Sequence, residues 1–172
     1  MRLEIDRWVI RKITENDIPA LVKYANNRKV SINLRDRFPF PYTERDGRAW
    51  IEKTAAEPPP GHSFIIADER ELIGGIGLEM GEDIHRHSAE IGYWLGEPFW
   101  GQGIATRAVL AMTRFGFERF GLTRIFATVM ETNPSSAAVL EKAGYSFEGR
   151  LCRSVIKDGR ILDELMYAIV KT

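Results

Sequence analysis

A glycine-rich segment in the second half of the chain has the composition of a phosphate-binding loop. From Leu95 to Thr106 it reads Leu-Gly-Glu-Pro-Phe-Trp-Gly-Gln-Gly-Ile-Ala-Thr, and it joins a predicted strand to a predicted amphipathic helix. Gly101, Gly103 and Ala105 let a phosphate approach the main chain, because they carry little or no side chain. The free amides and the dipole of a helix N-terminus also favour an anion. The segment suits a pyrophosphate, and an ordinary glycine-rich turn is an equal alternative.

Two common phosphate-binding motifs fit this segment poorly. A Walker loop requires Gly-Lys-Ser/Thr, whereas Gln102, Gly103 and Ile104 stand in succession here. A dinucleotide fingerprint needs a third small residue where Thr106 stands, and it belongs to a leading parallel βαβ unit. A nucleotide-binding module that uses the same loop is kept as an alternative.

The stretch from Glu90 to Thr106 resembles the acetyl-CoA signature of the GNAT superfamily of N-acetyltransferases. That signature reads Gln/Arg-x-x-Gly-x-Gly/Ala; Gly103 and Ala105 occupy its small positions, and Trp100 replaces the usual Gln or Arg. This departure is familiar in the RimJ/RimL-like branch, the ribosomal-protein N-terminal acetyltransferases and their relatives. Further matches to that branch are Asn133-Pro134-Ser135-Ser136, Leu140 to Tyr145, Glu148-Gly149, Asp158-Gly159 and Asp163.

The resemblance implies a site for acetyl-CoA, and it assigns a role to several residues of the loop. Amides between Gly101 and Thr106 would hold the pyrophosphate, and the Leu95 amide would polarise the acetyl carbonyl. Asn133 would contact the pantetheine arm, and a structural role ahead of Pro134 at a helix start is compatible with that contact. The residues predicted to bind the cofactor are Leu95, Trp100, Gly101, Gln102, Gly103, Ile104, Ala105, Thr106 and Asn133.

Two side chains are predicted to move the protons that acetyl transfer requires. A protonated amine has no lone pair, so attack on the thioester needs a base. Glu90, on the strand that leads into the loop, is the first candidate for this base, and Glu131 or ordered water could serve instead. The non-catalytic alternative for Glu90 is a surface or salt-bridged carboxylate. Many GNAT members protonate the leaving thiolate from a helix tyrosine, where this chain has Leu140. Ser136 is therefore the candidate hydroxyl, with helix capping as its alternative role.

The acceptor region is predicted in the aromatic, proline-broken loop between the first two helices. Arg35, Phe38 and Phe40 are the candidate acceptor-binding residues, and packing within a lid is the alternative. The acceptor would be an amine, at a peptide N-terminus or on a small molecule, because similar folds serve many acceptors. His85 and His87 have no third ligand at a suitable spacing, so no metal is expected.

Hydrophobic periodicity predicts the elements that position these residues. Three consecutive strands favour antiparallel pairing, and a later strand–helix–strand unit favours one parallel step. The predicted fold class is α/β, with a mixed, mostly antiparallel sheet flanked by helices, as in the GNAT (acyl-CoA N-acyltransferase) fold. The predicted strands are 8–13, 63–68, 72–80, 88–95, 124–130, 147–156 and 161–170, and the predicted helices begin at 14, 43, 102 and 135.

Length and composition set the class of protein. The 172 residues, 44% of them apolar, predict a single domain over residues 1–172. Equal numbers of basic and acidic side chains, 24 each, argue against a nucleic-acid partner. No apolar run approaches the roughly 20 residues of a membrane helix. The lone Cys152, expected to be buried on a strand, and the charged first residues are compatible with a cytoplasmic protein. A homodimer is left open.

The predicted reaction is direct transfer of the acetyl group from acetyl-CoA to a primary amine. No nucleophilic cysteine or serine pattern suggests a covalent enzyme intermediate. The alternative is a coenzyme A-binding regulatory module without turnover, which Leu140 in place of the usual tyrosine motivates.

Overall fold

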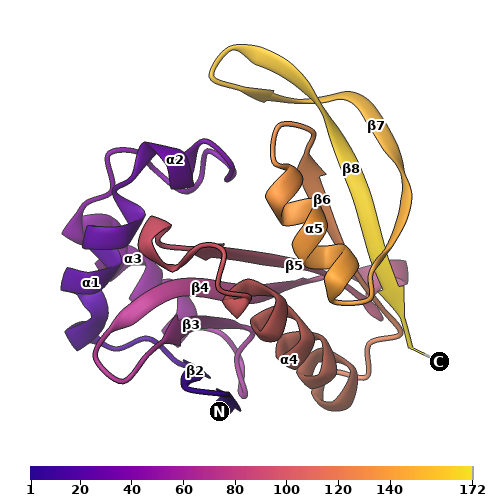
Figure 1. Ribbon diagram of the computed structural model, residues 1–172. Helices are drawn as coiled ribbons and strands as arrows, with labels where there is room; N and C mark the ends of the chain where they lie inside the picture. The colour runs from indigo at the N-terminus through magenta and orange to yellow at the C-terminus, as the bar shows by residue number, and fades with distance from the viewer. Residues whose placement is uncertain (172) are drawn as a thin grey trace. The chain divides into compact units, whose positions relative to one another are not determined.

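The computed structural model describes residues 1–171 (Figure 1). The strands of these residues are β1 (Arg2–Ile5), β2 (Trp8–Arg11), β3 (Ser63–Ala67), β4 (Leu72–Met80), β5 (Ser88–Leu95), β6 (Arg124–Met130), β7 (Ser146–Lys157) and β8 (Arg160–Val170). The α-helices are α1 (Ile18–Ala25), α2 (Arg28–Ser31), α3 (Glu44–Ala55), α4 (Ile104–Arg119) and α5 (Pro134–Lys142). Short 3-10 helices are η1 (Glu15–Asp17), η2 (Asp83–His85) and η3 (Glu97–Phe99).

Internal contacts divide the chain into two compact units. The first consists of residues 1–77 and 93–104, and the second of residues 78–92 and 105 onwards. Strands β4 and β5 each have residues in both units. A single domain over residues 1–172 therefore stays a prediction.

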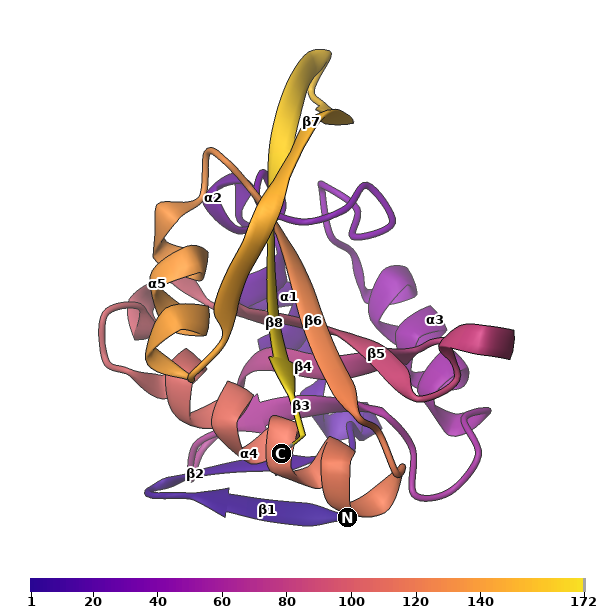
Figure 2. The ribbon, with the colours of Figure 1, turned by 90° about the vertical axis from the view of Figure 1, so that its right-hand side faces the viewer.

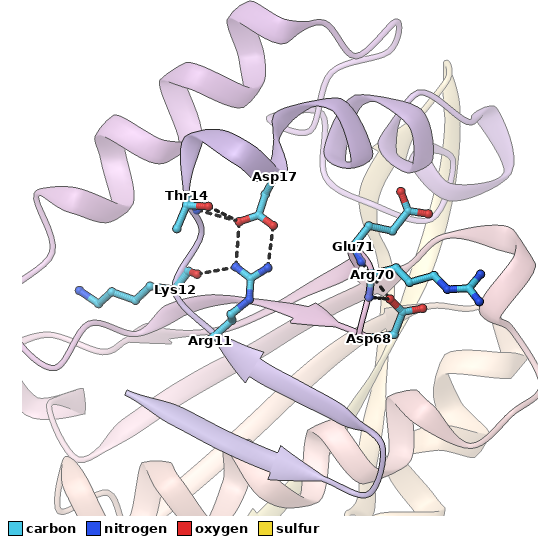
Figure 3. Close-up of polar contacts among 7 residues, drawn as sticks. All are labelled: Arg11, Lys12, Thr14, Asp17, Asp68, Arg70 and Glu71. Atoms are coloured by element: carbon cyan, nitrogen blue, oxygen red, sulfur yellow. Dashed lines mark hydrogen bonds and ion pairs between the residues drawn. The ribbon is translucent and has the colours of Figure 1, made fainter.

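The first unit contains strands paired in the order β1-β2-β3-β4, all antiparallel. The predicted hairpin between β3 and β4 is present. Its turn is closed by the Asp68 amide, which donates to the Glu71 carbonyl at 3.1 Å, and by the Asp68 carboxylate, which accepts the amides of Arg70 and Glu71 (Figure 3). Helix α1 packs its apolar face on this sheet, with Leu21 and Ala25 fully buried beside Ile65.

Two short elements of this unit were not predicted. Strand β1 precedes the predicted first strand and pairs with it, with Ile5 opposite Trp8. Helix α2 occupies Arg28–Ser31, in a stretch expected to be irregular, and Asn27 caps it by accepting the Lys29 amide at 2.9 Å. Each element has four residues, too few for a hydrophobic period to be recognised, so only the tertiary structure reveals them.

Thr14 and Asp17 begin the first helical segment as a capping box (Figure 3). The Asp17 carboxylate accepts hydrogen bonds from the Thr14 amide at 2.8 Å and from the two terminal nitrogens of the Arg11 guanidinium at 2.8 and 2.7 Å. Asp17 is only 4% exposed. Burial raises its pKa, but the Arg11 and Thr14 donors outweigh burial, so the pKa of Asp17 lies below its ordinary value. Asp17 thus fastens α1 to β2 as a carboxylate.

Replacement of Asp17 by Asn is expected to lower the free energy of unfolding at pH 7 by about 1–3 kcal/mol, because Arg11 loses its charged acceptor. Because its pKa is lower in the folded state, Asp17 stabilises the fold at pH values above its unfolded-state pKa of about 3.9. This contribution is lost as the pH falls through the folded-state pKa. Urea unfolding of both proteins at pH 7 and at acid pH should show the difference shrinking on acidification. The exposed Glu69→Gln is the control and should change little. An unchanged stability for Asp17→Asn at pH 7 would contradict this account.

The second unit contains strands in the order β5-β6-β8-β7 (Figure 2). Strands β5 and β6 are parallel, which confirms the predicted parallel step. Strand β8 pairs antiparallel with both β7 and β6, and its pairing with β6 was not predicted. Asp158 and Gly159, with φ of +50° and +73°, form the tight turn of the closing hairpin. Helix α5 lies along β7 and β8. The helix ends at Lys142, and Gly144, two residues later, has a φ of +86°, the left-handed conformation typical of a residue that follows a helix C-terminus.

Two local predictions in the chain's second half are corrected. The helix predicted from Gln102 begins at Ile104, because the left-handed φ of +73° at Gly103 is incompatible with a helix. Cys152, expected to be buried, is exposed. It follows Leu151, where the register of β7 against β8 shifts, and Arg153 has a φ of +55°. The irregular strand therefore turns the thiol to solvent.

Candidate active site

The segment between β5 and α4 has the backbone conformation expected of the glycine-rich loop (Figure 1). Gly101 and Gly103 both have φ of +73°, a value that residues with side chains rarely adopt. Helix α4 begins directly afterwards at Ile104, so the first helical amides follow the second glycine. A Cβ added to Gly101 would have no heavy atom within 4 Å. The main chain is therefore open where a phosphate has to approach it.

Side chains of the loop are tied back to carbonyls of the same segment. The Trp100 indole donates to the Leu95 carbonyl at 2.8 Å, although the side chain is 45% exposed. The Gln102 amide donates to the Pro98 carbonyl at 3.1 Å. Trp100 and Gln102 therefore connect the loop to the end of β5 and to η3.

A second set of contacts holds the start of this loop and has no sequence signal. Glu97 accepts a hydrogen bond from the Asn27 side chain at 2.8 Å and forms an ion pair with Lys29. The Lys29 and Asn27 donors hold the pKa of Glu97 below its ordinary value. A Cβ on Gly96 would lie 2.8 Å from the Tyr24 ring, so glycine permits the close packing of this turn on α1. These contacts hold Gly96 and Glu97, at the start of the loop, against α1 and α2.

The three predicted acceptor residues have different environments. Phe38 packs against the core, with its ring centroid 5.1 Å from that of Tyr42 and 5.4 Å from that of Trp94. Phe40 is 47% exposed, and the Arg28 guanidinium lies 5.6 Å from its ring. Arg35 is exposed. Phe38 thus has the packing role that was the alternative, and Phe40 and Arg35 present their side chains at the surface.

Glu90 stands on the last rung of the parallel ladder between β5 and β6. The ladder has three rungs and ends where Glu90 is opposite Phe126. The Glu90 carboxylate accepts a hydrogen bond from Thr128 Oγ1 at 3.0 Å. Thr128 lies two residues beyond Phe126, so the carboxylate reaches past the last rung toward the carboxyl ends of the strands. Glu90 is half-buried there, which suits a base that must meet an incoming amine.

The alternative base, Glu131, belongs to a charged network after β6. Its carboxylate accepts Arg150 at 3.0 Å and the Asp163 amide at 3.1 Å. Arg150 also donates to the Asp163 carboxylate at 2.7 Å, and the Arg153 amide donates to it at 2.7 Å. The Arg153 amide and Arg150 hold the pKa of Asp163 below its ordinary value. Both oxygens of Glu131 are engaged in this network.

Asn133 and Ser136 come together in the first turn of α5. The Asn133 side chain accepts the Ser136 amide at 3.3 Å, so Asn133 has the capping role that its position suggested. Leu140, which replaces the usual tyrosine, is fully buried. The nearby Tyr145 is 3% exposed, and its hydroxyl is hydrogen-bonded to Thr113 at 2.7 Å. Neither position offers an accessible phenol, so Ser136 keeps its candidacy as the proton donor.

Metal-binding clusters and membrane-spanning helices are both absent from the described part of the chain. Residues 1–171 contain no group of three or more His, Cys, Asp or Glu arranged to hold a metal ion. Within the same residues, no helix combines the length and the apolar character needed to cross a membrane.

The chain is similar to known acetyltransferases over most of its length. The family model described as "Acetyltransferase (GNAT) domain" matches residues 7–146. The uncharacterized N-acetyltransferase YoaA of Bacillus subtilis (strain 168) is 32% identical over 184 residues, which cover 98% of this chain and 96% of the relative. The ribosomal-protein-serine acetyltransferase of Escherichia coli (strain K12) is 28% identical over 162 residues, which cover 92% of this chain and 90% of the relative.

A solved structure with the same fold is that of RimL, a ribosomal L7/L12 alpha-N-protein acetyltransferase in complex with coenzyme A. It aligns with a TM-score of 0.87 at 23% sequence identity, over 99% of this chain and 98% of that chain. The likeness confirms the predicted fold class.

Proposed function

The chain belongs to the GNAT acetyltransferase family and is an N-acetyltransferase that uses acetyl-CoA, and we propose that its acceptor is a primary amine at a peptide N-terminus or on a small molecule. The relative named a ribosomal-protein-serine acetyltransferase supports the peptide class. Because ribosomal proteins are made and used in the cytoplasm, we also propose that the protein acts there. The observation that carries the proposal is the pair of left-handed glycines directly before α4, within the segment that the family model matches.

The proposed cofactor residues follow from this loop. Acetyl-CoA supplies an acetyl group activated as a thioester. Its pyrophosphate fits the loop, because the glycine conformations at 101 and 103 expose main-chain amides ahead of the α4 dipole. We assign the amides from Gly101 to Thr106 to the pyrophosphate, the Leu95 amide to the acetyl carbonyl and Asn133 to the pantetheine arm. Trp100 and Gln102 keep the loop in shape.

The proposed chemistry uses two side chains of the second unit. Glu90 accepts a proton from the acceptor amine, whose lone pair then attacks the thioester carbonyl. The new bond joins nitrogen to the acetyl carbon, and the bond between that carbon and sulfur breaks. The Ser136 hydroxyl donates a proton to the leaving sulfur, and the second proton that the attacking nitrogen has to lose restores the hydroxyl, so that a neutral amide and free coenzyme A are formed. No enzyme nucleophile is needed for this sequence.

The function is tested by following coenzyme A release with a panel of peptides and small-molecule amines. Thermal-shift measurements with acetyl-CoA, ATP and NAD accompany the assay. Release that depends on one class of amine supports the proposal and identifies the acceptor. Stabilisation by acetyl-CoA without release for any amine would instead indicate a regulatory module, and stabilisation by ATP or NAD alone would indicate a nucleotide-binding module.

Replacement of Ser136 by Ala is expected to lower kcat while leaving the Kd for acetyl-CoA nearly unchanged, because the hydroxyl acts on charge that develops at sulfur. A lost neutral hydrogen bond of about 0.5–1.5 kcal/mol corresponds to a decrease of roughly three- to tenfold. The matched control is Ser135→Ala, one position earlier on α5, which should keep the parent's kcat. Equal turnover for Ser136→Ala and the parent would leave Ser136 a purely structural role in the helix.

A further inference from the structure

The hydroxyl of Thr128 makes a contact for which the chemistry above has no role. Thr128 Oγ1 donates to Glu90 Oε1 at 3.0 Å, across the end of the parallel ladder. We propose that Thr128 is a positioning residue that holds the Glu90 carboxylate in the orientation needed to take a proton from the acceptor amine. This inference rests on the proposed function, because it requires Glu90 to be the base.

The pleat of β6 places this hydroxyl on the correct face of the strand. Buried residues Ile125, Ala127 and Val129 alternate along β6 with half-buried residues Phe126, Thr128 and Met130. Glu90 is aligned with Phe126 and is also half-buried. Side chains that are two residues apart in a strand point to the same face. Thr128 is therefore the next side chain beyond the Glu90 rung on the face that carries the carboxylate.

The end of the ladder explains why the carboxylate needs a partner. Strand β5 continues to Leu95 and β6 to Met130, but their pairing ends at Glu90 and Phe126. The Glu90 carboxyl group thus extends past the region where the backbone ladder fixes both strands. A glutamate side chain has several rotatable bonds, and its freedom opposes any single orientation. A base must come within about 2.6–3.2 Å of the proton that it removes, so an unrestrained carboxylate is poorly placed.

Thr128 is a rigid donor. Its backbone is paired with Met166 in the antiparallel ladder between β6 and β8. Its branched Cβ also restricts the side chain to few rotamers, so the hydroxyl has a nearly fixed position. The contact joins one carboxylate oxygen of Glu90 to this fixed point. A donor with a nearly fixed position, hydrogen-bonded to one oxygen of a longer side chain, is the arrangement expected of a positioning contact.

Replacement of Thr128 by Val, which keeps the shape and removes the hydroxyl, is expected to lower kcat on the order of tenfold, the effect of losing a hydrogen bond to a charged group. The KM for acetyl-CoA should stay near that of the parent, since the cofactor loop is not altered. Thr128→Ser keeps the hydroxyl and should recover most of the rate. Melting temperatures show whether both variants are folded. If Thr128→Val and the parent have the same kcat, or if Thr128→Ser is as slow as Thr128→Val, the proposal is overturned.

A double-mutant cycle with Glu90→Ala separates positioning from a structural effect. The four proteins are compared from neutral pH, where turnover depends on the base, to high pH, where the deprotonated amine lets the Glu90→Ala proteins turn over measurably. If Thr128 acts through Glu90, Thr128→Val should change little in the Glu90→Ala background. An equal loss in both backgrounds would mean that Thr128 supports the fold rather than the base. If the parent protein releases no coenzyme A with any amine, the proposed function is wrong and so is this inference. If turnover is present and depends on Glu90, the cycle tests the role of Thr128 alone.

Discussion

Replacement of Glu90 by Gln is expected to lower turnover near neutral pH by about 10²–10⁴-fold, the range associated with loss of a general base. The amide keeps the shape of the side chain, and its oxygen can still accept the hydrogen bond that Thr128 donates to Glu90. It cannot take up the proton that the attacking amine has to lose. The affinity for acetyl-CoA should be retained, because the change removes basicity and leaves the glycine loop unaltered.

The pH dependence of this loss is the sharper test. As pH rises, a growing fraction of the amine is deprotonated without help, so the ratio of parent to variant rates should shrink. The measurement is a pH–rate profile of both proteins with the best acceptor found. Glu131→Gln is examined beside them, because the engagement of Glu131 with Arg150 and the Asp163 amide speaks against its being the base. A Glu90→Gln protein with the parent's profile would exclude Glu90, and a selective loss in Glu131→Gln would assign the base there.

Local sequence patterns were sufficient for much of the fold. The observed bounds of β4, β5 and β6 coincide with the predicted ranges 72–80, 88–95 and 124–130. Hydrophobic residues mark β6, and the turn residues Asp158 and Gly159 lie between the two strands of the closing hairpin. Thr43, at which the second helix is predicted to begin, forms a capping box with Asp46, whose carboxylate accepts the Thr43 amide at 2.8 Å. In these elements the local signal and the tertiary structure agree.

Contacts between distant residues could not be predicted in the same way. Glu90 and Thr128 are 38 positions apart, and Asn27 and Glu97 are 70 positions apart. Neither pair has a sequence spacing that reveals it, because the contacts depend on strand register and helix placement. The sequence places Glu131 next to Asn133, but it does not reveal the contact between Glu131 and Arg150 for the same reason. Candidate residue types were thus readable from the sequence, but their partners were not.

Replacement of Gly103 by Val is expected to weaken acetyl-CoA binding strongly. The φ of +73° at Gly103 lies in the left-handed region, which costs a residue with a Cβ roughly 1–2 kcal/mol and a β-branched residue more. The loop must therefore shift or bear strain, and the added side chain obstructs close approach of a phosphate. Loss of one or two amide contacts, at about 1–3 kcal/mol each, should lower the affinity for acetyl-CoA by at least roughly 10- to 100-fold. Calorimetric titration measures this change directly.

Backbone strain alone has to be separated from loss of the ligand contact, and Gly121 provides a matched control. Its φ of +62° is also left-handed, a Cβ there would have no heavy atom within 4 Å, and it lies after α4 rather than before it. Gly121→Val should therefore suffer a comparable loss of stability while retaining the parent's affinity for acetyl-CoA. Unfolding curves confirm that both variants are folded at the titration temperature. A folded Gly103→Val protein that binds acetyl-CoA as tightly as the parent would remove the loop from the site, and equal weakening in both variants would attribute the effect to strain.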